Sequence, residues 1–210
     1  MKISLIIAFL TLLAIELSAQ QPNNSKLYEL AIEQRLNYVD EDRDSLTSII
    51  LIEQFQGDWL EFAHAAVGGI NELTQEDKNL FYSAIYYKED EIKLFNNNPE
   101  LFRLIAELDR VFTEPPTLND STLSLSLPTK ITNYREFNAN KVDKLWKKFY
   151  RKYPSTFGFF ELSQVVYDGD FACFYMGHHV ANLYASGDII FMRNVNGTWE
   201  IIYQMNLWMS

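Results

Sequence analysis

Apolar residues recur with a helical period in several stretches of the chain. Residues 26–39 carry apolar side chains near one face, which predicts an amphipathic helix. Residues 53–112 are also predicted to be helical, most clearly over 100–112, which follow an Asn-Pro pair suited to a helix start. A further helix is predicted after Asn140, with Pro154 as its stop. Its inward side is expected to hold Val142, Leu145, Trp146, Phe149 and Tyr153.

Strands are predicted where apolar residues cluster or alternate without a helical period. Residues 45–52 are rich in β-branched and apolar residues, and residues 121–127 alternate Leu with Ser or Thr before Pro128. Further along, Asp168-Gly169 and Asn196-Gly197 suit two-residue hairpin turns, because both central positions there need a positive φ. Two hairpins in series predict a four-stranded antiparallel sheet at the end of the chain.

The Asn196-Gly197 turn also predicts which residues of the last two strands face each other. The expected pairs are Arg193 with Glu200, Phe191 with Ile202, Gly187 with Asn206, and Ala185 with Trp208. The better candidate for the core is the face expected to carry Met192, Ile190, Ile201, Tyr203, Met205 and Leu207. The predicted fold class is therefore α+β, with helices packed on one face of a C-terminal four-stranded antiparallel sheet.

The N-terminal residues have the features of a signal peptide. Lys2 precedes an uncharged apolar run, residues 3–15, which is too short to span a bilayer as a helix. Small residues around Ala19 suit cleavage, so the prediction is a signal peptide at 1–19 and a single α+β domain at 20–210. Within that domain, 20–120 is expected to be mainly helical and acidic, and 121–210 mainly strands. The mature protein is expected to be exported, to the periplasm or beyond the cell, without a stable membrane anchor.

The charge distribution and the cysteine content exclude one class of partner and one kind of cross-link. The formal net charge is −10, and residues 21–120 hold 20 acidic and 8 basic residues, whereas residues 121–210 hold 7 and 9. An acidic front half repels phosphate backbones, so nucleic acid is not an expected partner. Cys173 is the only cysteine, which excludes an internal disulfide.

An acidic cluster has part of a calcium-binding pattern. Asp40, Asp42 and Asp44 stand at the first, third and fifth positions of such a loop, but Ser45 and Leu51 occupy the places of its Gly and its bidentate Glu. We therefore expect no tight calcium site and interpret the cluster as a solvated turn.

Cys173 would need a nearby base to act as a nucleophile. On a regular strand His178 points to the opposite face, and His179 is about 20 Å away at 3.3 Å per residue. His64 is an alternative base that would have to approach from elsewhere in the fold, but buried structural cysteines are the more common case. The prediction is a structural Cys173.

His178 and His179 do not form a metal pair if they lie on a strand, because adjacent strand residues face opposite sides. We interpret them as turn or sheet-edge histidines.

The sequence has no G-x-S-x-G, glycine-rich phosphate loop, H-E-x-x-H or paired-cysteine zinc spacing. No catalytic, cofactor-binding or metal-binding residue is therefore predicted.

A basic cluster lies in the helix predicted after Asn140. Its members are Lys141, Lys144, Lys147, Lys148, Arg151 and Lys152. They are most simply the solvent face of an amphipathic helix. Docking onto the acidic front half, in the same chain or between copies, is a second interpretation, and binding of anionic glycans or lipids is a third.

The C-terminal region carries a set of distinctive motifs: W-K-K-F-Y-R-K-Y-P-S-T-F-G at residues 146–158, Leu162-Ser163, N-G-T-W at 196–199 and W-M-S at 208–210. With these motifs the region resembles a group of uncharacterised secreted proteins from Bacteroidota-type bacteria. It covers about the last 70 residues, with looser agreement over 27–53. The resemblance implies export and a helix-then-sheet layout, and it transfers no catalytic residue.

These observations leave three hypotheses about function. The leading one is a non-catalytic exported protein that binds a small ligand or an envelope protein. The alternative is a carboxylate-dependent hydrolase with its site in a cleft between helices and sheet, and the third is assembly through sheet edges. Two close acids in the cleft would favour the hydrolase, whereas an apolar or aromatic pocket would favour the binding protein.

Overall fold

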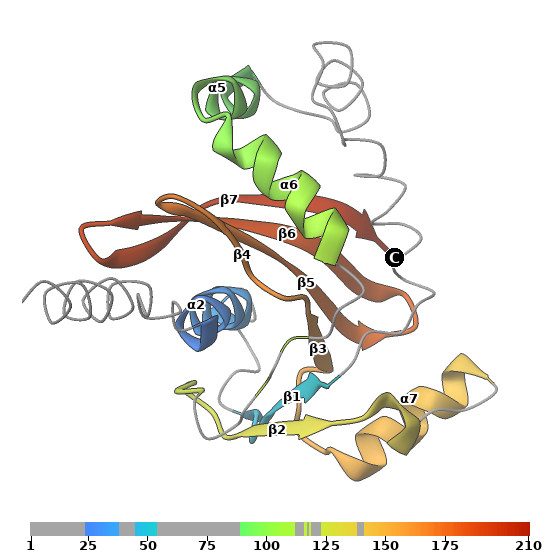
Figure 1. Ribbon diagram of the computed structural model, residues 1–210. Coiled ribbons are helices and arrows are strands. Elements are labelled where there is room, and N and C mark those ends of the chain that lie inside the picture. The colour runs from blue at the N-terminus through green and yellow to red at the C-terminus, as the bar shows by residue number, and fades with distance from the viewer. Residues whose placement is uncertain are drawn as a thin grey trace, which may run out of the picture.

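A seven-stranded mixed sheet forms the centre of the protein (Figure 1). The computed structural model describes residues 24–37, 45–53, 89–111, 116, 118, 123–137 and 141–210. The strands are β1 (Ile49–Ile52), β2 (Thr129–Thr132), β3 (Phe159–Leu162), β4 (Val166–Asp168), β5 (Phe171–Ala181), β6 (Tyr184–Val195) and β7 (Thr198–Met209). The helices are α2 (Asn24–Asn37), α5 (Glu89–Asn97), α6 (Glu100–Val111), η3 (Tyr134–Glu136) and α7 (Val142–Lys152).

The α+β class is confirmed, but the predicted four-stranded antiparallel sheet is wrong. The strand order is β2-β1-β3-β5-β6-β7, with β4 paired to β5 beside this path. β1 pairs in parallel with both β2 and β3. Its four residues are all buried, as is typical of a central strand covered on both faces. A segment from the front of the chain thus extends the C-terminal sheet.

Helices cover both faces of this sheet, so the prediction of one covered face is wrong. Ala172, Phe174 and Met176 of β5 pack in one core with α2. Phe171 and Tyr175, which alternate with them, pack in another core with α6. Figure 1 shows α2 and α6 on opposite sides of the sheet. The long apolar strands β5 and β6 bury both of their faces, which an alternating pattern does not anticipate.

The predicted helices at 26–39 and 100–112 correspond to α2 and α6. The buried side chains of α6 include Leu101, Leu104, Ile105 and Leu108, which is the predicted stripe. Asn98, of the Asn-Pro pair at the predicted helix start, donates from its side-chain amide to the carbonyl of Leu94 at 2.7 Å. The predicted signal peptide, the acidic cluster Asp40, Asp42 and Asp44, and His64 lie outside the described residues.

The predicted basic amphipathic helix is α7. Leu145, Phe149 and Tyr153 are buried against β3 and η3, as expected, whereas Val142 at the first turn is half exposed. Asn140 lies outside the described residues, and Lys141 takes the N-cap position without a side-chain hydrogen bond. All six basic residues of the cluster are exposed, as expected for the outer face of an amphipathic helix. No helix among the described residues is long and apolar enough to cross a membrane.

The prediction of a strand at 121–127 is wrong for the described part of this segment. Residues 123–127, here called the strap, form no strand. Its leucines pack on the α2 core. Its backbone amides donate hydrogen bonds to side chains of α2 and pair with none of the described strands. The amide of Ser124 donates to Glu29 at 2.6 Å, and the amide of Ser126 donates to Glu33 at 2.5 Å. The true strand, β2, begins only after Pro128, and the predicted strand at 45–52 is shortened to β1.

The Asn196-Gly197 turn is confirmed, with φ values of 54° and 87°. Arg193 also faces Glu200 as predicted. The earlier turn is displaced by one residue, because Asp168 pairs with Phe171 and leaves Gly169 and Asp170 as the turn.

Two irregularities shift the rest of the β6–β7 register. Phe191 faces Tyr203 instead of Ile202, and Asp188 faces Asn206 in place of Gly187. Trp208 lies opposite Gly187, so its predicted pairing with Ala185 is wrong. Each bulge adds one residue to β7 and exchanges its faces. The expected core face is therefore divided: Met192, Ile190 and Ile201 lie on the α2 side, whereas Tyr203, Met205 and Leu207 lie on the α6 side.

Candidate ligand pocket

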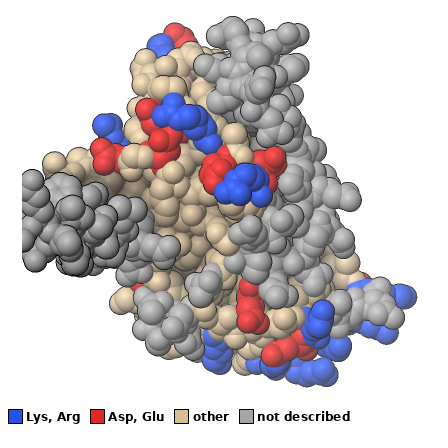
Figure 2. Space-filling view, viewed as in Figure 1, with Lys and Arg blue, Asp and Glu red and all other residues tan. Residues whose placement is uncertain are grey.

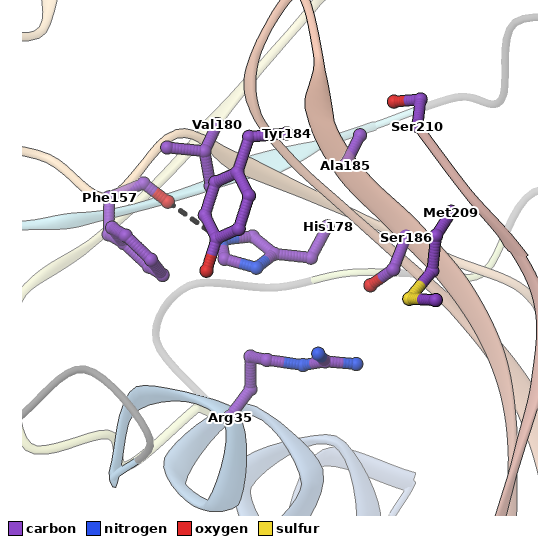
Figure 3. Close-up of a pocket in the computed structure, with 9 residues that line it drawn as sticks. All are labelled: Arg35, Phe157, His178, Val180, Tyr184, Ala185, Ser186, Met209 and Ser210. Carbon is purple, nitrogen blue, oxygen red and sulfur yellow. Dashed lines mark hydrogen bonds between the residues drawn. The ribbon is translucent and has the colours of Figure 1, made fainter.

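A pocket of about 260 Å³ lies between the C-terminal end of α2 and the end of the sheet formed by β5, β6 and β7 (Figure 3). It is here called the Arg35–His178 pocket. Its lining residues are Arg35, Phe157, His178, Val180, Tyr184, Ala185, Ser186, Met209 and Ser210. Most of this lining is apolar, and a few polar groups converge on it, which is the composition of small-ligand sites.

Arg35 is held in this pocket by a partly buried ion pair. It stands in the last turn of α2 and pairs through Nη2 with the carboxylate of Asp188 on β6. Asp188 is 3% exposed and also accepts a hydrogen bond from Nδ2 of Asn206 at 2.9 Å. Nε of Arg35 is buried and has no hydrogen-bond acceptor among the described residues. The ion pair thus fixes α2 to the sheet and offsets the positive charge at the pocket.

His178 forms another wall as a neutral ring. Its Nε2 lies 2.8 Å from the carbonyl oxygen of Phe157. Because a carbonyl only accepts, Nε2 carries the hydrogen and Nδ1 carries a lone pair. Burial lowers the pKa of His178 to about 3, and the charge of Arg35 also lowers this pKa. The ring stacks on Phe160 with centroids 4.2 Å apart. Figure 3 shows its second nitrogen directed toward Arg35.

Ser186, His178 and Asp188 share this face of the sheet but are not arranged as a catalytic triad. A triad needs the histidine between the hydroxyl and the carboxylate. Here His178 donates to a backbone carbonyl, and the Ser186 hydroxyl is directed to Asp188 at 3.4 Å. A histidine with a pKa near 3 is also a weak general base at neutral pH. The arrangement suits hydrogen bonding to a ligand better than proton abstraction.

A second, smaller pocket of about 110 Å³ lies on the opposite face of the sheet, beside α7. Trp146, Phe159 and His179 contribute aromatic walls. Ala185 and Ser210 line both pockets, so the two are neighbours separated by the ends of β6 and β7. None of the acidic residues lines either pocket among the described parts of the chain.

A row of four cross-strand neighbours crosses the sheet on the α6 side. Glu161 faces Gly177, Gly177 faces Gly187, and Gly187 faces Trp208. Glu161 is 1% exposed, and its Oε2 lies 3.3 Å from Nε2 of His179. Neither carboxylate oxygen receives a hydrogen bond from the described residues. The row is closely packed at its two glycines, and none of its four residues lines either pocket.

The structure places the residues singled out in the sequence as follows. His178 and His179 point to opposite faces of β5, as predicted, but they are buried within a strand and not at a turn or sheet edge. Cys173 is buried in the α6-side core, and burial raises the pKa of its thiol. Among the described residues, no group of three His, Cys, Asp or Glu side chains is placed to hold a metal ion.

Sequence reasoning missed Arg35 and Asp188. A signal for Asp188 exists, because a lone acid precedes the apolar run I-I-F-M at 189–192 and must be paired if that strand is buried. No local signal identifies Arg35 as its partner, since the two residues lie 153 positions apart. No family model, curated protein or solved structure matches the chain.

Proposed function

We propose that this protein binds a small, partly apolar ligand in the Arg35–His178 pocket and catalyses no reaction there. The observation that carries the proposal is the pocket itself, in which polar groups held by buried partners converge on an apolar lining. Such preorganised polar groups fix the orientation of a ligand, and the apolar walls supply most of its buried area.

The polar groups indicate which ligand would fit. Nδ1 of His178 is an acceptor and needs a donor such as a hydroxyl or an N–H group. The Ser186 hydroxyl can donate or accept, and Arg35 has donors for an oxygen of the ligand. Because Asp188 already pairs with Arg35, the pocket does not require a fully charged anion. A ligand with an apolar body and one hydroxyl end satisfies these groups, because a hydroxyl donates to Nδ1 of His178 and accepts from Arg35.

The hydrolase alternative has less support. A carboxylate mechanism needs two acids facing a common substrate position, with their pKa values pushed apart. Among the described residues, neither pocket has an acidic residue in its lining. The pocket contents therefore favour the binding protein.

The experiment uses three matched probes that share a phenyl ring: benzoate, benzyl alcohol and benzylamine. We expect benzyl alcohol to shift the NMR signals of the His178 ring most, because its hydroxyl can donate to Nδ1 of His178 and accept from Arg35. Benzoate lacks the donor, and protonated benzylamine lacks the acceptor, so both should have weaker effects. Ser186→Leu should fill the pocket and abolish these shifts. Thr198→Leu, at an exposed position of β7 outside the pocket, is the matched control. Unchanged binding in folded Ser186→Leu would refute the proposed site.

We also propose that the protein acts outside the cytoplasm. The support is the signal-peptide pattern of residues 1–19 and the resemblance of the C-terminal region to secreted proteins. N-terminal sequencing of the protein from exported material should find Gln20 or a neighbour as the first residue. Retention of Met1 in an envelope fraction would contradict this proposal.

A further inference from the structure

Four large apolar side chains are exposed at one end of the molecule. Leu183 and Tyr184, at the turn between β5 and β6, are 80% and 59% exposed. Met209 is 78% exposed and Val142 is 49% exposed. Soluble proteins rarely gather large apolar side chains in one exposed patch unless the patch contacts a partner.

Pocket geometry shows that these four side chains lie near one another. Tyr184 and Met209 line the Arg35–His178 pocket, and Val142 lines the smaller pocket together with Asn182. Leu183 stands between Asn182 and Tyr184 in the chain. The two pockets share Ala185 and Ser210, so the four side chains lie around the same end of β6 and β7. We call them the apolar tip.

The basic cluster of α7 begins beside the apolar tip. Lys141 immediately precedes Val142, and the cluster continues along the exposed side of the helix to Lys152. Glu136 pairs with Lys152, and Asp143 is the only acid within α7. Figure 2 shows basic side chains gathered at the lower right of the molecule, where Figure 1 places α7. An exposed apolar group thus has positive charge next to it.

We propose that the apolar tip and the basic cluster form a surface that docks reversibly onto an anionic lipid bilayer. Apolar side chains enter the boundary between headgroups and acyl chains, while basic side chains attract anionic headgroups. Five of the six basic residues are lysines. Protein interfaces are depleted in lysine and enriched in arginine, so this composition favours a lipid surface over a protein partner.

The net charge of −10 does not prevent such docking. Charges separated by more than about 8 Å are largely screened at physiological ionic strength. The acidic first turn of α5, Glu89 to Glu91, lies at the top of Figure 1, whereas α7 with the basic cluster lies at the bottom. The local charge next to the bilayer therefore determines the attraction.

A fluorophore attached at the tip tests the proposal in the full chain. Leu183→Cys is labelled with an environment-sensitive nitrobenzoxadiazole group, because Cys173 is buried and native labelling is confined to the new thiol. The matched control is Val195→Cys, at the tip of the β6–β7 hairpin, where the side chain is 40% exposed. The probes are vesicles of phosphatidylcholine alone and of phosphatidylcholine mixed with phosphatidylglycerol.

We expect the label at position 183 to shift to the blue on mixed vesicles, and to be quenched by spin-labelled lipids, while the label at 195 does neither. No shift at 183, or an equal shift at both positions, would overturn the proposal. A shift at 183 that grows with protein concentration without vesicles would also overturn it, because the tip would then contact a second copy of the chain.

Charge reversal tests the basic cluster separately. Each basic side chain near an anionic surface strengthens partitioning by roughly fivefold, so Lys144→Glu with Lys147→Glu should weaken binding at the tip by about twenty-five-fold or more. Lys93→Glu on α5 is the control, because Lys93 is exposed and lies outside the cluster. Equal binding by both variants would show that the lysines do not contact lipid and would refute the proposed surface.

Discussion

The indole of Trp208 lies directly over Gly187, its partner on the neighbouring strand, and its Nε1 donates a hydrogen bond to the hydroxyl of Tyr175 at 3.2 Å. A Cβ atom on Gly187 would overlap the indole and would stand 2.6 Å from the Tyr175 oxygen. Only glycine leaves room for this ring. The pairing exists because two bulges add residues to β7 and move Trp208 from Ala185 to Gly187.

Gly187→Ala should destabilise the protein by about 1 to 3 kcal/mol, since overpacking a filled site forces side chains out of their preferred positions. Denaturant melts of the variant and the original protein measure this difference. In a Trp208→Ala background the same substitution should cost much less, because the indole that it meets is absent. An equal cost in both backgrounds would contradict the packing explanation.

The sequence predicted correctly those elements that depend only on residues close together in the chain. The Asn196-Gly197 turn follows from the positive φ at both positions, and α6 and α7 follow from apolar residues at helical spacing. The pairing of Arg193 with Glu200 follows from the turn because it precedes the first bulge. Beyond that bulge the period-two rule fails, since one extra residue exchanges the faces of the strand.

Long-range partners determined what the patterns missed. The strap has the alternation of a strand, but carboxylates of α2, about a hundred positions earlier, accept its amide hydrogens. The parallel pairs of β1 and the ion pair of Arg35 with Asp188 likewise join distant segments. For the site, alternation placed His178 and His179 on opposite faces, but it did not show that either is buried.

Cys173 should react slowly in the folded protein. Its thiol is buried, and burial raises the pKa of the group, so the reactive thiolate is scarce at neutral pH. We expect modification by a disulfide reagent to be slow in the native state and fast in denaturant. Cys173→Ala should cost about 1 kcal/mol for a small core truncation. Rapid native labelling with loss of ligand binding would contradict a structural role.

The strap should detach locally when its carboxylate partners are removed. Glu29 is buried and accepts the amide hydrogen of Ser124, so Glu29→Ala should cost about 2 kcal/mol, in the range of hydrogen bonds to charged groups. Glu29→Gln keeps an acceptor oxygen and should cost less. Hydrogen exchange provides a local readout: the Ser124 amide should lose protection in Glu29→Ala. Protection that persists in this variant would show that another group holds the strap.

His178 should make the folded protein sensitive to mild acid. In the unfolded chain its pKa is about 6.5, whereas burial lowers its pKa to about 3 in the folded protein. Unfolding therefore takes up a proton between these values. The stability that the neutral ring provides is fully present above pH 6.5 and is lost progressively as the pH falls toward 3. Between pH 7 and pH 5, protonation of His178 in the unfolded chain should lower the free energy of unfolding by about 2 kcal/mol.

His178→Gln removes this titration and keeps an amide that can donate to the carbonyl of Phe157. The variant should be less stable than the original protein at pH 7, because the stacking of the ring on Phe160 is lost. Between pH 7 and 5, however, its free energy of unfolding should fall by about 2 kcal/mol less than that of the original protein. Urea melts at both pH values measure the two slopes, and NMR should show no titration of His178 near pH 6.5. Equal acid sensitivity in both proteins would place the proton uptake at other groups and contradict a neutral, buried His178.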